Sequence, residues 1–353
     1  MNKIVLTGGG TAGHCIPNVA ILPLLKKHFD GIYYIGTENG IEKKIIEKEK
    51  IPYYSVPCAK LRRDFSLKNL GIPFKVFSGI INAKKILKTL KPDLVFSKGG
   101  YVSVPVVYAA YMLKIPVISH ESDITPGLAN RITARYCKAV LTSFPDTAKR
   151  IKNGIYVGSP IRNELLKKSE KNYEMFGFTG EKPVLLIMGG SSGAKAINDV
   201  IFSSLSELLR KFDIIHICGK GNVFIQKKDG YFPVEYLDDM KSAFTIADIC
   251  VSRAGSNSAF ELMALKIPTL FIPLPKNASR GDQILNAEFF YNKNLAKVLY
   301  QEDLTKTTFV KAVYDLFYNK DKLKRKLNES EFSAANAKIV DQLLNYSVKD
   351  QRS

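Results

Sequence analysis

The chain has 353 residues, a length that accommodates about two domains, each large enough to bury its own core. Hydrophobic residues make up 46% of it and charged residues 24%, the balance of an ordinary soluble globular protein. The net charge of +19 favours an anionic partner, such as nucleic acid, a membrane surface or a phosphorylated substrate.

Cysteine usage and hydropathy exclude further classes. The five cysteines show no Cys-x-x-Cys spacing, so neither a zinc site nor a disulfide framework is indicated, and we expect reduced cytoplasmic thiols. The longest uncharged stretch, residues 99–113, contains glycine and proline and is shorter than the roughly 18 apolar residues that a spanning helix needs. We therefore expect no segment that crosses a membrane.

Apolar runs alternate with helical patterns along the chain, which predicts an α/β fold with parallel, doubly wound sheets. The expected strands are residues 4–6, 32–35, 94–96, 117–119 and 139–141 in the first half, and 184–188, 214–218, 249–252 and 269–272 in the second. Turn formers without periodicity follow residue 156. We place the boundary there, between an N-terminal domain at 1–158 and a C-terminal domain at 159–353. The last helix of the C-terminal domain is a candidate to pack against the N-terminal domain.

A glycine-rich turn follows the first expected strand of each half. Residues 8–14 read GGGTAGH and residues 189–194 read GGSSGA, and each turn precedes a segment with helical spacing. Residues 93–100 and 248–255 also match, because both run from an aspartate through a strand to a basic residue and a glycine. Glycine lets the backbone approach an anionic group, and the helix N-terminus adds positive potential. Because ligands bind at the carboxyl edge of such sheets, we expect these turns to face a cleft for phosphates or sugars.

The first turn alone leaves two other interpretations open. Gly8-x-Gly10-x-x-Gly13 matches the dinucleotide fingerprint, and Glu38, after the second expected strand, is a candidate partner for a ribose. An NAD-dependent oxidoreductase is therefore the alternative function. A turn that serves backbone geometry alone is the second alternative.

The second half carries a more specific pattern. A turn leads into a helix with Glu261, and its candidate site residues are Arg253, Gly255, Ser256, Asn257 and Ser258. This arrangement pairs a phosphate-accepting helix N-terminus with a carboxylate that accepts sugar hydroxyls. Residues 280–286 add compact polar groups suited to a hexose. The competing interpretation makes the two serines helix caps and Glu261 part of a solvated face.

Six motifs in one order carry a resemblance to a known family. They are Thr7 to His14, Lys98 to Ser103, His120 to Asp123, Gly158 to Arg162, Gly189 to Ser191 and Gly281 to Gln283. The chain resembles the MurG family of peripheral membrane glycosyltransferases, which make lipid II for bacterial cell walls. The resemblance implies a GT-B fold, two Rossmann-like domains that face each other across a cleft. It also implies inverting transfer of N-acetylglucosamine from UDP-N-acetylglucosamine to the 4-hydroxyl of the muramyl sugar of lipid I, at the cytoplasmic face of the cell membrane.

The family pattern assigns the donor nucleotide mainly to the C-terminal domain. It implies that Arg162 and Ser191 contact the uridine diphosphate, that the main chain near Leu237 contacts the uracil, and that residues 256–258 contact the phosphates. Helix N-termini and Arg162 then neutralise the charge of the leaving group. Because the chain has no Asp-x-Asp triplet, we predict transfer without a metal, and we expect no cofactor.

The same pattern assigns the sugar contacts. It places Glu261 on the ribose, and Asp282 and Gln283 on the N-acetylglucosamine hydroxyls. From the other domain the donor is covered by Thr11, Ala12 and Gly13. Asp123 is a further assigned contact, at a position where many relatives have asparagine.

Inversion at the anomeric carbon requires one general base. His14 directly follows the first glycine turn, and an imidazole with an ordinary pKa of about 6.5 suits this task, so we predict that it is the base. Glu121, which we expect in a loop together with His120, is the competing candidate or an orienting partner. A binding protein that has lost its base is a further, non-enzymatic alternative. We expect His28 and His216 to be structural.

Much of the basic excess lies in one segment. Residues 60–91 contain nine basic residues against one acidic residue, interleaved with apolar side chains. Such a pattern is typical of segments that lie in the headgroup region of an anionic bilayer, and we expect inner-leaflet phospholipid as a partner. The alternative is that the apolar residues are core and the lysines a solvated face. No recognition module accompanies the charge, so we expect no nucleic-acid partner. Other cell-wall synthesis proteins are further candidate partners.

Overall fold

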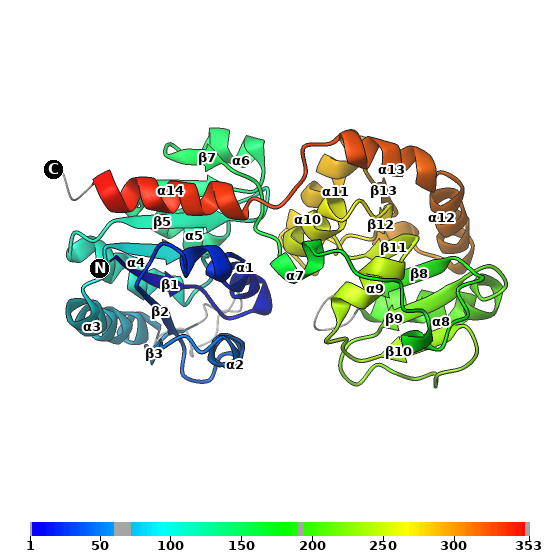
Figure 1. Cartoon of the computed structure of the whole chain (residues 1–353), viewed down its shortest axis with the longest axis horizontal. Helices are drawn as coiled ribbons and strands as arrows, with labels where there is room; N and C mark the ends of the chain where they lie inside the picture. Colours follow the sequence, from blue (N-terminus) through cyan, green and yellow to red (C-terminus); the bar gives the residue numbers. More distant parts are fainter. Residues whose placement is uncertain (1, 60–71, 190–193, 350–353) are drawn as a thin grey trace. The chain divides into compact units, whose positions relative to one another are not determined.

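The structure, a computed structural model, describes residues 2–59, 72–189 and 194–349. The chain forms two compact units, one made of Met1–Arg162 with Ala334–Ser353 and the other of Asn163–Ser333 (Figure 1). The last helix, α14 (Asn336–Lys349), thus belongs to unit 1, although it follows the whole of unit 2 in the sequence. Each unit is built around one parallel β-sheet.

Unit 1 contains a seven-stranded parallel sheet in the order β3-β2-β1-β4-β5-β6-β7. All five strands expected in this half are confirmed. The strands are β1 (Lys3–Thr7), β2 (Gly31–Gly36), β3 (Tyr53–Ser55), β4 (Leu94–Ser97), β5 (Val117–Glu121), β6 (Ala139–Thr142) and β7 (Gly154–Tyr156). The two strands that the sequence did not indicate, β3 and β7, lie at the two edges and have three residues each. Edge strands this short carry no apolar run, because they bury little.

Helices cover both faces of this sheet, as the predicted doubly wound fold requires. On one face, α1 (Ile16–Leu25) and α14 share a core in which Ile21 and Leu25 meet Ile339 and Leu343. On the other face lie α3 (Ile72–Leu90) and α4 (Ser103–Met112). Figure 1 shows α14, in red, alongside the elements of unit 1. Among the described residues, unit 1 also contains the helices η1 (Ala12–His14), α2 (Ile41–Lys48), α5 (Leu128–Thr133), η3 (Ala134–Tyr136) and α6 (Pro145–Arg150).

A buried asparagine fixes α14 in unit 1. The Asn336 side chain accepts a hydrogen bond from the Ile161 N–H (2.9 Å) and donates to the carbonyls of Ile161 (2.8 Å) and Ala20 (3.1 Å). The Ala335 N–H donates to the Ser159 carbonyl at 3.1 Å. The two segments in which the chain leaves and re-enters unit 1 are therefore fastened to each other within that unit.

Unit 2 contains a six-stranded parallel sheet in the order β10-β9-β8-β11-β12-β13. The four expected strands are confirmed, and the unexpected β10 and β13 again lie at the edges. The strands are β8 (Val184–Met188), β9 (Asp213–Ile217), β10 (Tyr231–Val234), β11 (Ile249–Ser252), β12 (Thr269–Phe271) and β13 (Lys297–Val298). The helices are α7 (Asn163–Leu166), η4 (Glu174–Phe176), α8 (Lys195–Leu208), α9 (Met240–Ile246), α10 (Ser256–Ala264), α11 (Asp282–Asn292), η5 (Gln301–Asp303), α12 (Lys306–Tyr318) and α13 (Lys320–Glu329).

The matching segments 93–100 and 248–255 occupy equivalent places in the two sheets. Asp93 precedes β4 and accepts a hydrogen bond from the Lys3 N–H of β1 at 2.7 Å. Asp248 precedes β11 and accepts one from the Val184 N–H of β8 at 2.9 Å. In both sheets the strand order reverses between these paired strands. The glycine turns that follow β1, β4 and β11 therefore lie at the switch points of the two sheets, where α/β folds bind ligands. Residues 190–193, in the turn expected after β8, lie outside the described residues.

Candidate active site

The first glycine turn connects β1 to a short 3-10 helix. Gly8 (φ +151°) and Gly10 (φ +86°) adopt backbone conformations that side chains disfavour. The turn continues into η1, which ends at His14, and α1 begins only at Ile16. Thr11 Oγ1 lies 2.8 Å from His14 Nδ1, so the hydroxyl holds the imidazole ring. Of the predicted covering residues, Thr11 and Gly13 are exposed and Ala12 is half-buried.

The second glycine motif of unit 1 packs directly against the first. A Cβ at Gly100 (φ +79°) would lie 2.3 Å from the Gly9 carbonyl oxygen and 3.3 Å from His14 Cγ. A side chain at this position would therefore displace the first turn. The structure thus brings together two motifs that are separated by more than 80 residues in the sequence, and His14 lies where they meet.

Glu121 is the last residue of β5, whereas the sequence interpretation placed it in a loop. That interpretation was wrong because the strand extends through His120 and Glu121, polar residues that are buried at the carboxyl edge of the sheet. The Glu121 carboxylate accepts hydrogen bonds from the Asp123 N–H (2.9 Å), the Gly127 N–H (2.9 Å) and Asn130 Nδ2 (2.8 Å). Burial, together with the nearby Asp123 charge, raises the pKa of Glu121. A carboxylate that organises its own following loop fits the orienting role better than that of the base.

A buried lysine, to which the sequence reasoning assigned no role, joins this network. Lys98 Nζ lies 2.7 Å from His120 Nδ1 and also contacts the Ser122 hydroxyl. His120 Nε2 lies 3.0 Å from the Gly158 carbonyl oxygen, to which it donates, so Nδ1 accepts from the lysine. Burial lowers the pKa of Lys98 to about 8, and burial with the Lys98 charge keeps the pKa of His120 well below its usual value. Contacts across 22 and 38 residues leave no local sequence signal.

In unit 2, the turn after β11 leads into α10 through Gly255. The N-cap residue of α10 is Gly255, which has no side chain to accept a capping hydrogen bond. Ser256 and Ser258 lie within the helix, so neither is its N-cap residue. A Cβ at Gly255 would meet no atom within 4 Å. Ser256 and Glu261 are buried, and Asn257 and Ser258 are half-buried. The interpretation of Glu261 as part of a solvated face is therefore wrong, and an open turn at the helix N-terminus suits an anion.

Arg253 points into the protein. Its guanidinium donates to the carbonyls of Ile272 (3.0 Å) and Pro273 (3.2 Å) and to Gln301 Oε1 (2.7 Å). Burial lowers the pKa of Arg253 to about 10. These contacts connect the turn after β11 to the segments that follow β12 and β13. The geometry therefore gives Arg253 a supporting part at this edge of the sheet.

The motif around Gln283 reaches the same turn. Gly281 (φ +80°) precedes α11, and Asp282 pairs with Arg280 at 3.6 Å. Gln283 Oε1 accepts from the Leu274 N–H at 3.1 Å. Asn286 Nδ2 donates to the Ala254 carbonyl at 3.1 Å, which fastens α11 to the turn before α10. The two motifs of unit 2 are thus brought together.

The remaining predicted contacts are placed less specifically. Leu237 is buried in the segment before α9, and Asp123 is half-buried in the loop that Glu121 organises. Arg162 is half-buried and is the last residue of the first segment of unit 1. Ser191 lies outside the described residues. In the part of the chain that the structure describes, no group of three His, Cys, Asp or Glu side chains is arranged to hold a metal ion.

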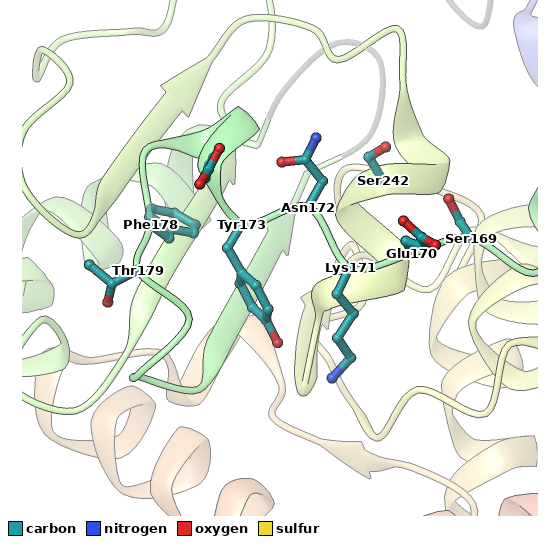
Figure 2. A pocket seen from close by; sticks show the side chains of 9 residues that line it. Ser169, Glu170, Lys171, Asn172, Tyr173, Phe178, Thr179 and Ser242 are labelled. Atoms are coloured by element: carbon teal, nitrogen blue, oxygen red, sulfur yellow. The ribbon is translucent and has the colours of Figure 1, made fainter.

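A separate hollow of about 700 Å³ lies in unit 2 (Figure 2). Its lining is mostly polar and comes from the segment before β8 and from α9, at Ser169, Glu170, Lys171, Asn172, Tyr173, Glu174, Phe178, Thr179 and Ser242. Among the residues that the structure describes, none of the predicted site residues lines it. The candidate site therefore rests on the glycine turns and not on this hollow.

The basic segment is described from residue 72 onward, where α3 begins. Its inner face buries Ala83 and Leu87 against α4. On the outer face Phe74 is 80% exposed, Phe77 65% and Ile81 42%. Their spacing of three and four residues places them on one side of the helix. The apolar residues therefore divide between core and surface. Within residues 2–59, 72–189 and 194–349, no helix is long and apolar enough to span a bilayer.

Comparison with known proteins gives the family. The glycosyltransferase family 28 N-terminal domain matches residues 4–142, and the C-terminal domain of the same family matches residues 184–343. A relative from Clostridium tetani is 48% identical over 98% of both chains and is named UDP-N-acetylglucosamine--N-acetylmuramyl-(pentapeptide) pyrophosphoryl-undecaprenol N-acetylglucosamine transferase. A relative of the same name, numbered 2, from Bacillus thuringiensis subsp. konkukian is 50% identical over 93% of this chain and 95% of its own.

Solved structures agree with the sequence comparison. The crystal structure of MurG from Acinetobacter baumannii covers 98% of this chain and 100% of its own, with a TM-score of 0.77 at 25% identity. UDP-GlcNAc 2-epimerase from Neisseria meningitidis, bound to UDP-GlcNAc, has a TM-score of 0.69 at 14% identity over 98% of this chain and 100% of its own, and shares the fold alone. The predicted GT-B fold is confirmed. The chain belongs to the MurG family, within glycosyltransferase family 28.

Proposed function

We propose that this protein transfers N-acetylglucosamine from UDP-N-acetylglucosamine to the 4-hydroxyl of the muramyl sugar of undecaprenyl-pyrophosphoryl-MurNAc-pentapeptide, lipid I. The product is lipid II, the precursor of peptidoglycan. The observation that carries the proposal is near-full-length identity of 48% to a relative named for this reaction, in a chain whose motifs gather at the carboxyl edges of both sheets.

His14 acts as the general base in this proposal. When Nδ1–H donates to Thr11 Oγ1, the lone pair for a substrate proton is on Nε2. As His14 takes the proton of the 4-hydroxyl, that oxygen bonds to the anomeric carbon, and the bond from this carbon to the phosphate oxygen breaks. UDP leaves with the electron pair, and the imidazolium then returns its proton to water. Attack opposite an α-linked leaving group gives the β-linked product.

Unit 2 supplies the groups for the donor. The N–H groups at the start of α10 are assigned to the phosphates, Glu261 to the ribose and Gln283 to the N-acetylglucosamine hydroxyls. Oriented N–H groups stabilise the charge that develops on the departing phosphate. We propose that these N–H groups and Arg162 stabilise the leaving UDP without a metal ion.

The oxidoreductase alternative is not favoured. The Gly10 N–H, one of the groups that a dinucleotide turn offers to a pyrophosphate, donates to the carboxylate of Glu42 at 3.2 Å. A pyrophosphate on this turn would face a buried negative charge. The start of α1 is also separated from the turn by η1. The family membership points to glycosyl transfer in addition.

The membrane-facing part of the proposal concerns α3. A polyprenyl acceptor is held in a bilayer, and an enzyme that uses it gains from a surface that binds there. Phe74, Phe77 and Ile81 supply exposed apolar area beside exposed Lys75 and Lys85. Apolar groups inserted among anionic headgroups and lysines at their surface both favour binding. We propose peripheral attachment through α3 at the cytoplasmic face of the cell membrane.

The test is transfer of radiolabelled N-acetylglucosamine from UDP-N-acetylglucosamine to a lipid I analogue, followed by analysis of the linkage. The expected result is a β1→4-linked disaccharide product. Protection against thermal unfolding by UDP-N-acetylglucosamine, but not by NADH, is expected in parallel, at about 2.7 kcal/mol for a ligand at 100 times its dissociation constant. Binding of UDP-N-acetylglucosamine without formation of product would contradict the proposal that lipid I is the acceptor. Protection by NADH alone would restore the oxidoreductase alternative.

A further inference from the structure

Glu42 is a buried carboxylate to which the proposed mechanism assigns no role. It lies in the first turn of α2 and its side chain has no exposed surface. Its Oε2 accepts a hydrogen bond from the Gly10 N–H at 3.2 Å. Its Oε1 accepts from the Thr37 N–H at 3.1 Å and from the Thr37 hydroxyl. One buried carboxylate thus joins the loop after β2 to the first glycine turn.

The glycines around this carboxylate are explained by its size. A Cβ at Gly9 would lie 2.6 Å from Glu42 Cδ, and a Cβ at Gly40 would lie 2.2 Å from Glu42 Oε1. Neither contact is possible without displacing the carboxylate. The missing side chain at Gly9 therefore makes room for Glu42 within the protein.

A second buried group holds the other end of the turn. The Tyr34 hydroxyl of β2 donates to the Gly8 carbonyl oxygen at 2.5 Å. The Gly8 carbonyl and the Gly10 N–H are therefore both fixed from the interior, by Tyr34 and Glu42. The next residue is Thr11, whose hydroxyl holds the His14 ring. The direction in which the chain leaves Gly10 sets where this pair lies.

We infer that Glu42 is a positioning residue for His14, which it holds in place through Gly10 and Thr11. This inference rests on the proposed function, because it concerns the residue that is proposed to be the base. Displacement of a catalytic group by about 1 Å costs about 100-fold in rate, so a hydrogen bond below the turn has a kinetic effect without touching substrate.

The isosteric variant Glu42→Gln tests the inference. With its amide oxygen toward Thr37, glutamine turns an NH₂ group toward the Gly10 N–H, so a donor faces a donor. We expect kcat to fall at least tenfold, with the KM for UDP-N-acetylglucosamine within twofold of the parent value, because most of the assigned donor contacts lie in unit 2. Glu47→Gln is the matched control, since Glu47 is exposed on the same helix. Its kcat is expected to equal that of the parent.

A double-mutant comparison separates positioning from general loosening. In a His14→Ala background, Glu42→Gln is expected to change the residual rate less than twofold, because no base remains to be positioned. An equal loss in both backgrounds, or a kcat for Glu42→Gln within twofold of the parent, would overturn the inference. If the parent protein forms no product at all, the proposed function fails instead and takes the inference with it.

Thr37→Val serves if Glu42→Gln does not fold. It removes the hydroxyl donor to Glu42 and leaves the Thr37 N–H in place. A loss of about threefold in kcat is expected, again absent in the His14→Ala background. A Thr37→Val protein with the parent kcat and a lowered melting temperature would show that this contact serves stability alone, and would contradict the inference.

Discussion

Thr11 Oγ1 and His14 Nδ1 lie 2.8 Å apart at the two ends of a single 3-10 turn that directly follows the first glycine motif. The hydroxyl therefore selects the ring orientation of the histidine. In the family pattern, Thr11 was assigned to the donor. The structure adds a contact to the residue that we propose as the base.

Thr11→Val is expected to lower kcat by about tenfold, because valine keeps the shape of threonine and removes the hydrogen-bonding hydroxyl. Thr11→Ser keeps the hydroxyl and is expected to retain kcat within threefold. Steady-state kinetics on both variants checks this. Equal losses in the two variants would show that the methyl group, and not the hydroxyl, matters at this position.

Glu121→Gln is expected to lower stability more than it alters the chemistry. Glutamine replaces one of two oxygens that together accept three hydrogen bonds, and each bond to a charged group is worth about 1.5–3 kcal/mol. We expect a melting temperature several degrees lower and a higher KM for the acceptor. A variant with the parent melting temperature that has lost all turnover would instead make Glu121 the base.

The double variant Phe74→Asp, Phe77→Asp is expected to weaken binding to vesicles of anionic phospholipid by at least about tenfold. The reason is that each phenylalanine side chain that becomes buried in the bilayer contributes about 1.5–3 kcal/mol to binding. The affinity for UDP is expected to stay unchanged. Phe224→Asp is a suitable control, since Phe224 is 70% exposed in unit 2. Vesicle co-sedimentation provides the measurement. Equal binding by the parent and the double variant would leave α3 without a part in membrane attachment.

Acid is expected to destabilise the protein through His216. Its ring contacts the Tyr231 hydroxyl at 3.0 Å and Asn198 Oδ1 at 3.1 Å, and burial lowers its pKa from 6.5 to about 4. Well above pH 6.5 the ring is neutral in both the folded and the unfolded state. As the pH falls from 6.5 to 4, the unfolded state binds the proton first, so the free energy of unfolding falls.

Thermal melts of the parent and of His216→Gln, at about pH 7 and about pH 5, check this dependence. The parent is expected to lose more stability on acidification than the variant, by up to about 1.4 kcal/mol for each pH unit. Parallel losses in the two proteins would assign the acid sensitivity to other groups, among which the buried His120 is the first candidate.

Local patterns predicted the central strands and the glycine turns, because a buried parallel strand needs an apolar run and a tight turn needs glycine. The edge strands β3, β7 and β13 bury little and carry no such run. In the edge strand β10 a proline interrupts the apolar residues, and Tyr231 is its only buried residue. The position of α14 depends on Asn336, whose partners Ala20 and Ile161 lie far away in the sequence.

The candidate site shows the same division. His14 could be singled out because it directly follows a glycine motif. Glu42 could not, since within the sequence IEKKIIEK it resembles any other glutamate of an amphipathic helix. Lys98 lies in one of the six motifs, yet its contact with His120 arises only when β4 and β5 pair. Residues that support a site through contacts with distant parts of the chain produce no periodic pattern in the sequence, so sequence analysis does not identify them.

The most direct test of the account is the initial rate of sugar transfer to a lipid I analogue in the presence of EDTA, measured for the parent protein and for His14→Ala. We predict that the parent keeps its full rate with the chelator, and that His14→Ala loses about 100-fold or more while it still binds UDP-N-acetylglucosamine. A parent rate that EDTA abolishes and magnesium restores would contradict metal-free transfer. A His14→Ala rate equal to that of the parent would contradict the assignment of the base.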